Sequence, residues 1–327
     1  MEQRALGRTG LTVSALGFGC GNVGGLMVRG DAADQRRAVA HALDTGITYF
    51  DTAPQYGGGR SEKNLGRVLR ELGAHNRVVV GTKVRLAPGD RADPSAAIRR
   101  SIERSLSLLG RERVDVLQLH NPIAAGETAG GALPLAEVLG AVAEGLQQVV
   151  AAGLARHAGI TGLGEAAALG QAVSSGTFAT MQAYFNAIDP SAGYPGAAGG
   201  GQDFVGLIDH AAAAGLGVIA IRVLAAGALS GTAERAPNAS AAPGAPLVRG
   251  GEFERDVARA RELASLAAAW GLESTVELAV RFALAKPGVS TVLVGYSDLQ
   301  QLDDAIRWAE RGPLPADAVA RVIDAAR

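Results

Sequence analysis

Eight short apolar runs recur along the chain, and longer segments lie between them in which apolar residues return every three to four positions. Short runs of this kind are typical of buried β-strands, whereas the longer segments are typical of amphipathic helices. The pattern predicts strands at residues 14–20, 47–51, 77–83, 114–120, 156–161, 179–186, 217–224 and 289–295. It predicts helices at 31–45, 61–72, 94–109, 134–152, 164–174, 203–214, 253–270, 275–285 and 299–310, and a closing helix after 315.

The regular alternation of strand and helix predicts a parallel sheet, and eight such units predict closure into a barrel. We therefore expect an α/β protein with a (β/α)8 TIM-barrel fold, an N-terminal β-hairpin at residues 2–13 and extra helices near the C-terminus. Residues 1–327 are expected to form a single domain, because such barrels typically take about 250 residues or more. Residues 225–251 contain three prolines and little periodicity, so we expect a functional loop that clamps a cofactor.

A doubly wound open sheet is the alternative fold. That fold would favour a G-x-G-x-x-G fingerprint after its first strand, with a helix directly behind it. The run from Gly17 to Gly21 reads GFGCG and has neither the spacing nor the helix. The barrel is therefore the preferred prediction.

Residues suited to helix capping mark several of the predicted helix starts. Asp31 and Ser61 precede helical patterns, and Asp93 is followed by Pro94, a favourable pair for an N-cap and the first helical position. We expect these three residues to cap their helices.

Composition narrows the class of protein. Hydrophobic residues make up 48% of the chain, and the net charge of −1 gives no reason to expect nucleic acid or an anionic membrane as a partner. Cys20 is the only cysteine, which excludes an intrachain disulfide. There is no uninterrupted apolar stretch of about 18 residues and no apolar signal-peptide core at the start, so we expect a cytoplasmic protein.

Three consecutive predicted strands end in Asp51, Lys83 and His120, and Tyr56 follows the first of them in a glycine-rich loop. Each residue alone has an ordinary interpretation, such as a turn residue, a solvated charge or a packed ring. In a parallel barrel, however, the C-terminal strand ends face one another and build the active site. The sequence therefore predicts that these ionisable groups converge.

Their chemistry suits proton transfer to a carbonyl oxygen. A phenol has a pKa near 10, and a neighbouring ammonium is expected to lower it. Lys83 would supply that ammonium, Asp51 would hold Lys83 in place, and His120 would hydrogen-bond a substrate oxygen. Conversion of a carbonyl into an alcohol also needs a hydride, which no side chain supplies, so a nicotinamide cofactor is implied.

These residues lie in motifs that resemble the aldo-keto reductase family over nearly the whole chain. The motifs are LGFGCG, FDTAPQYGGGRSEKNLG, VVVGTKV, DVLQLHNP, TMQAYFN, GVIAIRVLAAGALSG and VLVGYSDLQQLDDAI. The resemblance implies a barrel that reduces aldehydes and ketones with NADPH, or in some cases oxidises sugars with NAD. It also implies that Asp51, Tyr56, Lys83 and His120 form a catalytic tetrad in which Tyr56 is the general acid/base.

The resemblance further assigns residues to the cofactor, from its carboxamide through its pyrophosphate to its adenosine. A plain polar residue inside the barrel is the alternative for Gln182, and helix capping is the alternative for Ser297. The cofactor-binding residues that the resemblance implies are Gly21, Asn22, Asp51, Thr161, Gln182, Arg222, Val223, Leu224, Gly227, Leu229, Gly231, Gly295, Ser297, Gln301 and Asp304.

Two departures from the family pattern concern the nicotinamide end. The family usually has Ser-Asn after the fifth strand, whereas Thr161 and Gly162 stand here. Many relatives have an aromatic residue before the pyrophosphate loop, whereas this chain has Ile221 followed by Arg222. Arg222 is expected to approach the cofactor or a substrate anion, and a structural salt bridge is the alternative.

The choice between NADP(H) and NAD(H) is open. A 2′-phosphate favours Arg or Lys, but residues 295–305 contain three aspartates and no basic residue. Arg307 lies one turn further on, and Arg235 and Arg249 lie in the long loop. The family favours NADP(H), which we place first, with NAD(H) close behind.

The sequence thus predicts an NAD(P)-dependent oxidoreductase that interconverts a small aldehyde or ketone, or a sugar lactol, and its alcohol or lactone. The alternative is a regulatory or sensor subunit that binds the cofactor and has weak catalysis; the complete tetrad argues against it. A metal-dependent hydrolase is disfavoured, because Asp51 and His120 have no companion ligands nearby in the sequence. The expected partner is a small-molecule substrate, and the protein is expected to be a monomer or a homo-oligomer.

Overall fold

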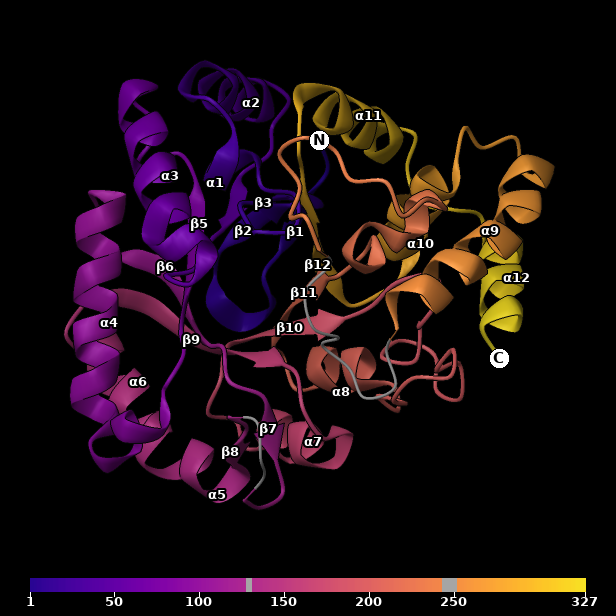
Figure 1. Ribbon diagram of the computed structural model, residues 1–327. Coiled ribbons are helices and arrows are strands. Elements are labelled where there is room, and N and C mark those ends of the chain that lie inside the picture. Colours follow the sequence, from indigo (N-terminus) through magenta and orange to yellow (C-terminus); the bar gives the residue numbers. More distant parts are fainter. Residues whose placement is uncertain (128–130, 243–251) are drawn as a thin grey trace.

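The computed structural model describes residues 1–127, 131–242 and 252–327. At its centre is a closed barrel of parallel strands, in which each strand pairs with the next along the chain and the last pairs with the first (Figure 1). The expected (β/α)8 barrel is thus confirmed. Its strands are β3 (Leu16–Gly19), β4 (Tyr49–Asp51), β5 (Val79–Val84), β6 (Val114–Leu119), β9 (Ala155–Gly162), β10 (Thr180–Tyr184), β11 (Gly217–Ile221) and β12 (Val289–Gly295).

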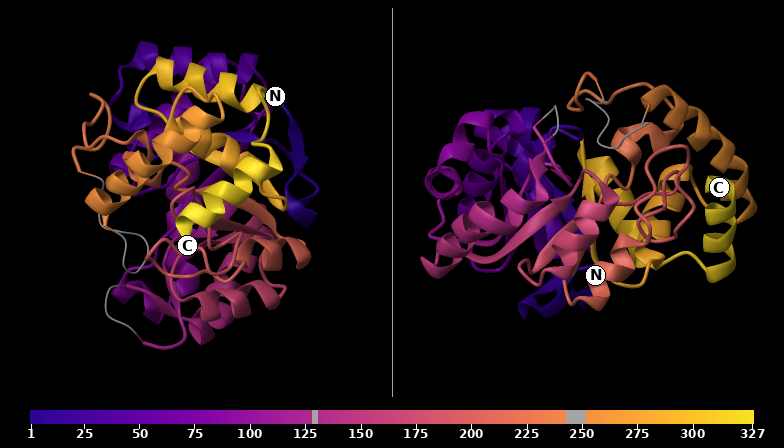
Figure 2. Two further views of the ribbon diagram at one scale, coloured as in Figure 1. Left: turned by 90° about the vertical axis from the view of Figure 1, so that its right-hand side faces the viewer. Right: turned by 90° about the horizontal axis from the view of Figure 1, so that it is seen from below.

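Helices surround the barrel on its outside (Figures 1 and 2). The extra helices expected near the C-terminus are present, because two helices connect β11 to β12 and two more follow β12. None of the helices in the described part of the chain is both long and apolar enough to cross a membrane. The helices are α1 (Leu26–Arg29), α2 (Ala32–Asp44), α3 (Arg60–Glu71), α4 (Pro94–Leu109), α5 (Leu135–Glu137), α6 (Ala143–Ala151), α7 (Ala166–Ser174), α8 (Leu207–Ala213), α9 (Phe253–Ala269), α10 (Thr275–Ala285), α11 (Leu299–Glu310) and α12 (Ala316–Ala326).

The predicted N-terminal hairpin is formed by β1 (Gln3–Ala5) and β2 (Thr12–Ser14), which pair antiparallel. Leu6 and Val13 from this hairpin are fully buried and pack against apolar side chains inside the barrel. The hairpin immediately precedes β3, so this apolar cluster fills the N-terminal end of the barrel. The C-terminal ends of the strands are thereby left for polar side chains.

The long helix predicted at 134–152 is interrupted. A short parallel pair, β7 (Ile123–Ala124) and β8 (Leu133–Pro134), leads into α5, and a wider turn, η4 (Val138–Val142), separates α5 from α6. Gly140 in this turn has a non-helical backbone (φ −95°, ψ −112°). Its missing Cβ makes that conformation accessible, which the apolar periodicity of the segment did not indicate.

The expected cap of α3 is wrong. The residue before this helix is Gly59, whose φ of +94° favours glycine, and Ser61 lies inside the first turn. Ser61 is instead buried, where its Oγ donates to the carbonyl of Cys20 (2.8 Å) and lies 2.7 Å from Oγ1 of Thr52. The caps expected at Asp31 and Asp93 are confirmed.

Candidate active site

Three adjacent strands bring the predicted ionisable residues together at the C-terminal end of the barrel. Asp51 ends β4, Lys83 lies near the end of β5, and His120 directly follows β6. Tyr56 begins the short helix η2 (Tyr56–Gly59) that follows β4. The Nζ of Lys83 is 5.0 Å from the centre of the Tyr56 ring, and the rings of Tyr56 and His120 are 6.1 Å apart in an edge-to-face arrangement.

Lys83 and Asp51 form a buried ion pair. Their side chains are 1% and 3% exposed, and the Nζ of Lys83 donates to Oδ1 of Asp51 and to the carbonyl of Thr52 (2.9 Å). Burial lowers the pKa of Lys83, but Asp51 and Tyr56 raise that pKa by more, so it lies above its ordinary value. Lys83 is therefore a fixed cation beneath the phenol.

Consecutive glycines position Tyr56. Gly57, Gly58 and Gly59 all have a positive φ, and no other residue adopts three such values in a row without strain. Burial raises the pKa of Tyr56, whereas Lys83 lowers it, and the net pKa lies above its usual value. Lys83 thus has the expected lowering effect on the pKa of the phenol, but burial outweighs it. The phenol is protonated at neutral pH and has a proton to donate.

His120 is neutral at pH 7. Burial, together with the positive charges of Lys83 and Arg85, lowers its pKa to about 3. Its Nδ1 lies 3.4 Å from Oε1 of Gln55, a residue that the sequence did not single out. A neutral imidazole with one nitrogen directed at Gln55 has the other available for a substrate oxygen.

Gln182 and Thr161 extend the network from the opposite side of the barrel. The Nε2 of Gln182, on β10, donates to Oδ2 of Asp51 at 2.7 Å. Thr161 is the register partner of Gln182 on β9, and its Oγ1 lies 3.5 Å from Oε1 of Gln182. Gln182 was expected at a cofactor carboxamide; in the structure its amide group donates to the tetrad carboxylate, and its oxygen retains a lone pair.

The first loop of the predicted cofactor site lies against the tyrosine loop. The side-chain oxygen of Asn22 accepts a hydrogen bond from the backbone N–H of Gly57 (2.9 Å). A Cβ placed on Gly21 would be 3.7 Å from the ring of Tyr56. This loop therefore supports Tyr56 directly, and its first residue lies beside the ring.

The turn after β11 has an unusual backbone. Arg222, Ala225 and Ala226 have φ values of +58°, +46° and +61°, which L-residues rarely adopt. Such conformations cluster at ligand-binding sites, and alternating turn conformations can orient backbone N–H groups toward an anion. The turn leads into the short helix η5 (Ala225–Ser230). The predicted pyrophosphate residues Val223, Leu224, Gly227, Leu229 and Gly231 all lie in this segment.

The end of β12 holds the predicted adenosine residues. Ser297 donates from Oγ to the carbonyl of Gly24 (2.8 Å), and its N–H donates to Oε1 of Gln301 (2.9 Å). Asp298 is the N-cap of α11, so capping is performed by Asp298 and Ser297 has a different role. Asp304 forms an ion pair with Arg307, and Gly295 at the end of β12 lies beside the backbone of Gly24.

The described part of the long loop crosses from β11 to the first loop. The Nδ2 of Asn238 donates to the carbonyl of Ser297 (2.9 Å), and the N–H of Ser240 donates to the carbonyl of Val23 (3.0 Å). Arg29 in turn donates from Nε to the carbonyl of Asn238 (2.8 Å). Residues 243–251, including Arg249, lie outside the described part of the chain. Residues 232–242 therefore span the ends of β11, β12 and β3.

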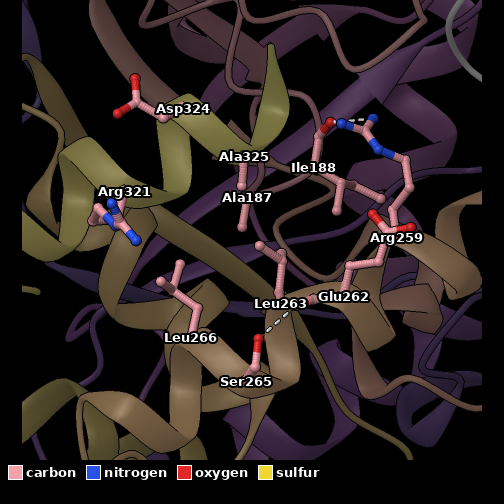
Figure 3. Close-up of a pocket in the computed structure, with 10 residues that line it drawn as sticks. All are labelled: Ala187, Ile188, Arg259, Glu262, Leu263, Ser265, Leu266, Arg321, Asp324 and Ala325. Atoms are coloured by element: carbon pink, nitrogen blue, oxygen red, sulfur yellow. Dashed lines mark hydrogen bonds between the residues drawn. The ribbon is translucent and has the colours of Figure 1, made fainter.

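A surface hollow of about 350 Å³ lies elsewhere, where α9 contacts α12 (Figure 3). Its lining residues come from these two helices and from Ala187 and Ile188, with Arg259 donating to the carbonyl of Ile188 at 2.8 Å. The tetrad is not among them. The hollow is therefore separate from the candidate active site.

The fold and the site together define a (β/α)8 barrel with a Tyr, Lys, Asp and His cluster at its C-terminal mouth. The model of the Aldo/keto reductase family matches residues 15–327, and the chain belongs to this family. It is therefore an oxidoreductase of a family that uses nicotinamide cofactors and acts on small carbonyl or sugar substrates.

The chain is also similar to several individual proteins. It is 29% identical to an L-galactose dehydrogenase of Arabidopsis thaliana over 94% of this chain and 87% of that protein. It is 51% identical to a pyridoxal 4-dehydrogenase of Microbacterium luteolum over 28% of this chain and 26% of that protein. An aldo-keto reductase from Bacillus halodurans, solved in its holo form, shares the fold, with a TM-score of 0.74, 24% identity and coverage of 100% and 97% of the two chains.

Proposed function

We propose that this protein is an NAD(P)-dependent oxidoreductase that interconverts a small aldehyde or ketone, or a sugar lactol, and the corresponding alcohol or lactone. The observation that carries the proposal is the position of the Tyr56 phenol above the buried Lys83–Asp51 pair, with the neutral ring of His120 beside it. The names of two relatives, which act on galactose and on pyridoxal, support an aldehyde or sugar substrate.

The residues present fit a dinucleotide cofactor. Gly21 lies beside the ring of Tyr56, where a Cβ would be 3.7 Å from it. The turn at 222–227 has a positive φ at several non-glycine positions, as expected where the backbone encloses a ligand. Thr161 and Gln182 would hold the carboxamide, the turn and η5 would hold the pyrophosphate, and Gln301 with Asp304 would hold the adenosine.

Each member of the tetrad has a distinct task in this mechanism. A nicotinamide cofactor, when bound, supplies the hydride that reduces the carbonyl carbon. The Tyr56 phenol donates its proton to the carbonyl oxygen, and Lys83 stabilises the phenolate that remains. Asp51 keeps Lys83 charged and in place, while His120 hydrogen-bonds the same oxygen and orients the substrate. In the oxidative direction, the phenolate accepts the proton.

We favour NAD(H) over NADP(H) as the cofactor, which reverses the order expected from the sequence. The cation on α11 that is suited to a 2′-phosphate, Arg307, is already paired with Glu273 and Asp304. Arg235 in the long loop donates to the carbonyls of Ala226 (2.8 Å) and Ser240 (3.0 Å), so its guanidinium is directed at its own loop.

The crossing segment 232–242 supports the role of a clamp. Its contacts to Val23 and Ser297 extend over the strand ends where the pyrophosphate and adenosine residues lie. A bound cofactor beneath this segment would be held until those contacts break.

Side-by-side titration with NADH and NADPH, followed by turnover assays with aldehydes and aldoses in both directions, tests the proposal. We expect binding of one cofactor with clear preference and turnover of at least one substrate class. Binding without any turnover would favour the sensor role instead. Binding of neither cofactor would overturn the proposal.

A further inference from the structure

Arg222 combines two properties that are costly in a folded protein. Its backbone has a φ of +58°, in the left-handed region that a bulky residue rarely adopts. The residue is partly buried, and its guanidinium has no hydrogen bond or ion pair with any residue of 1–127, 131–242 and 252–327. A strained backbone and an unpaired charge persist only where the surrounding structure enforces them, and such features cluster at ligand-binding sites.

Two other partly buried arginines of the described chain are paired with carboxylates. Arg111 pairs with Asp115 at 3.2 Å, and Arg281 pairs with Glu277 at 2.9 Å. Around Arg222 the groups that interact by charge are the phenols of Tyr56 and Tyr184 and the guanidinium of Arg235. A partly buried guanidinium with no carboxylate and no hydrogen-bond acceptor among the described residues has its donors available for an anion.

The position of Arg222 in the barrel indicates which kind of ligand group its guanidinium would bind. It follows β11 at the strand end, where its charge interacts with the phenol of Tyr56 and with the guanidinium of Arg235. The guanidinium presents a planar fork of donors that matches the oxygens of phosphate or carboxylate groups. The location therefore lies between the hydride-transfer end of the site and the turn assigned to the pyrophosphate.

We infer that Arg222 is the anion anchor of this active site, and that its guanidinium binds an oxyanion brought by the cofactor's pyrophosphate or by an acidic group on the substrate. The inference rests on the proposed function and adds to it a charged contact at the boundary between cofactor and substrate.

The test compares Arg222→Met and Arg222→Lys with Arg113→Met. Arg113 is exposed at the N-terminal end of β6, so the control removes the same charge at the opposite end of the barrel. Dissociation constants are measured for ADP-ribose, which carries the pyrophosphate, and for AMP, which does not. In parallel, kcat/KM is measured for 4-nitrobenzaldehyde and 4-carboxybenzaldehyde, an uncharged and a carboxylated aldehyde of similar size. Circular dichroism and thermal unfolding verify that each variant is folded.

If the oxyanion is the pyrophosphate of the cofactor, Arg222→Met weakens ADP-ribose binding at least tenfold, whereas AMP binding changes less than threefold. Arg222→Lys then recovers part of the lost ADP-ribose affinity. If the oxyanion is an acidic group of the substrate, ADP-ribose binding is unchanged in Arg222→Met. In that case kcat/KM falls at least tenfold for the carboxylated aldehyde only. Effects within twofold on both pairs, equal to those of Arg113→Met, overturn the inference. That outcome is distinct from failure of the proposed function, in which the wild-type protein itself binds no cofactor and turns over no aldehyde.

Discussion

Gln182 donates a hydrogen bond of 2.7 Å from its amide nitrogen to Asp51, the carboxylate that holds Lys83. Both residues are almost completely buried, and they come from opposite sides of the barrel. The hydrogen bond stabilises the charged form of Asp51, whose pKa burial raises and Lys83 lowers. Gln182 therefore influences the tetrad through its hydrogen bond to the carboxylate of Asp51.

Replacement of Gln182 by Met is expected to destabilise the protein by about 1–3 kcal/mol, because it leaves a buried carboxylate oxygen without its donor. The matched control is Gln118→Met. Gln118 is also buried, but neither atom of its amide has a hydrogen-bond partner in the described part of the chain. Urea unfolding should show a clearly larger loss for Gln182→Met than for Gln118→Met. Equal losses would mean that the hydrogen bond from Gln182 to Asp51 makes no measurable contribution to the free energy of unfolding.

Replacement of Tyr56 by Phe is expected to lower kcat by roughly 10²–10⁴-fold, the usual contribution of a general acid. Cofactor affinity should stay within a few fold, because the aromatic ring is retained. Tyr194→Phe is the control, since Tyr194 packs against Phe185 and Phe282, away from the tetrad. Steady-state kinetics and fluorescence titration of the cofactor separate the two effects. Substantial reductase activity in Tyr56→Phe would refute the assigned role.

Because the pKa of His120 is low in the folded protein, the free energy of unfolding is expected to depend on pH. In the unfolded chain the imidazole titrates near 6.5, whereas in the folded protein its pKa is lowered to about 3. The folded state thus binds fewer protons than the unfolded state between these values, so its stability is present above pH 6.5 and is lost as pH falls toward 3. His120→Asn should remove this contribution.

Denaturant unfolding at several pH values tests this prediction. Between pH 6 and pH 4, the free energy of unfolding of the wild-type protein should fall by about 1 kcal/mol more per pH unit than that of His120→Asn. Parallel curves for the two proteins would show that His120 is protonated in the folded state, and its proposed role as a neutral partner of the substrate oxygen would fail.

The arrangement of the barrel was accessible from the sequence because its signals are local. Apolar runs such as Val114–Leu119, the intervening helical periods and the turn residues between them specify the order of the elements. Asp51, Lys83 and His120 were predictable as a group, because strand ends of a parallel barrel meet at one end. The prediction that Ser61 caps its helix was wrong, because hydrogen bonds to the distant residues Cys20 and Thr52 determine the position of its side chain.

The remaining features of the site depend on contacts between distant segments. Gln182 and Asp51 are 131 residues apart, and no local pattern indicates that their side chains meet. The positive φ of Arg222, and the absence of a partner for its guanidinium among the residues that the structure describes, are likewise properties of the folded chain. The raised pKa of Tyr56 also escaped prediction, because the sequence indicated the nearby Lys83 charge but not the degree of burial.

The preference for NAD(H) is expected to depend on the carboxylates around Arg307. Glu273 accepts from Arg307, from Arg311 and from the indole N–H of Trp308 (3.1 Å). Glu273→Gln keeps an acceptor for the indole but removes a negative charge that neutralises Arg307. We expect the ratio of the dissociation constants for NADPH and NADH to fall about threefold to tenfold, consistent with the modest energy of an exposed ion pair.

The control for this change is Glu103→Gln on α4. It removes the same charge from a comparable exposed pair, in which Arg99 donates to Glu103 at 2.8 Å. The cofactor ratio of this variant should equal that of the wild-type protein in calorimetric titrations. An unchanged ratio in Glu273→Gln would indicate that Arg307 does not face the ribose of the cofactor.

The hydrogen bond from Asn238 to the carbonyl of Ser297 is expected to control the lifetime of the bound cofactor. It ties the segment 232–242 to the end of β12, so its loss in Asn238→Ala should speed cofactor dissociation about fivefold, the effect of a hydrogen bond worth about 1 kcal/mol. Gln147→Ala is the control, because it also removes an amide-to-carbonyl bond, to Thr177 at 3.2 Å, on the outside of the barrel. Stopped-flow displacement of the reduced cofactor measures both rates. Faster association should accompany faster dissociation, because the same contacts must break for the cofactor to enter; dissociation at the wild-type rate would exclude a clamp that is held by Asn238.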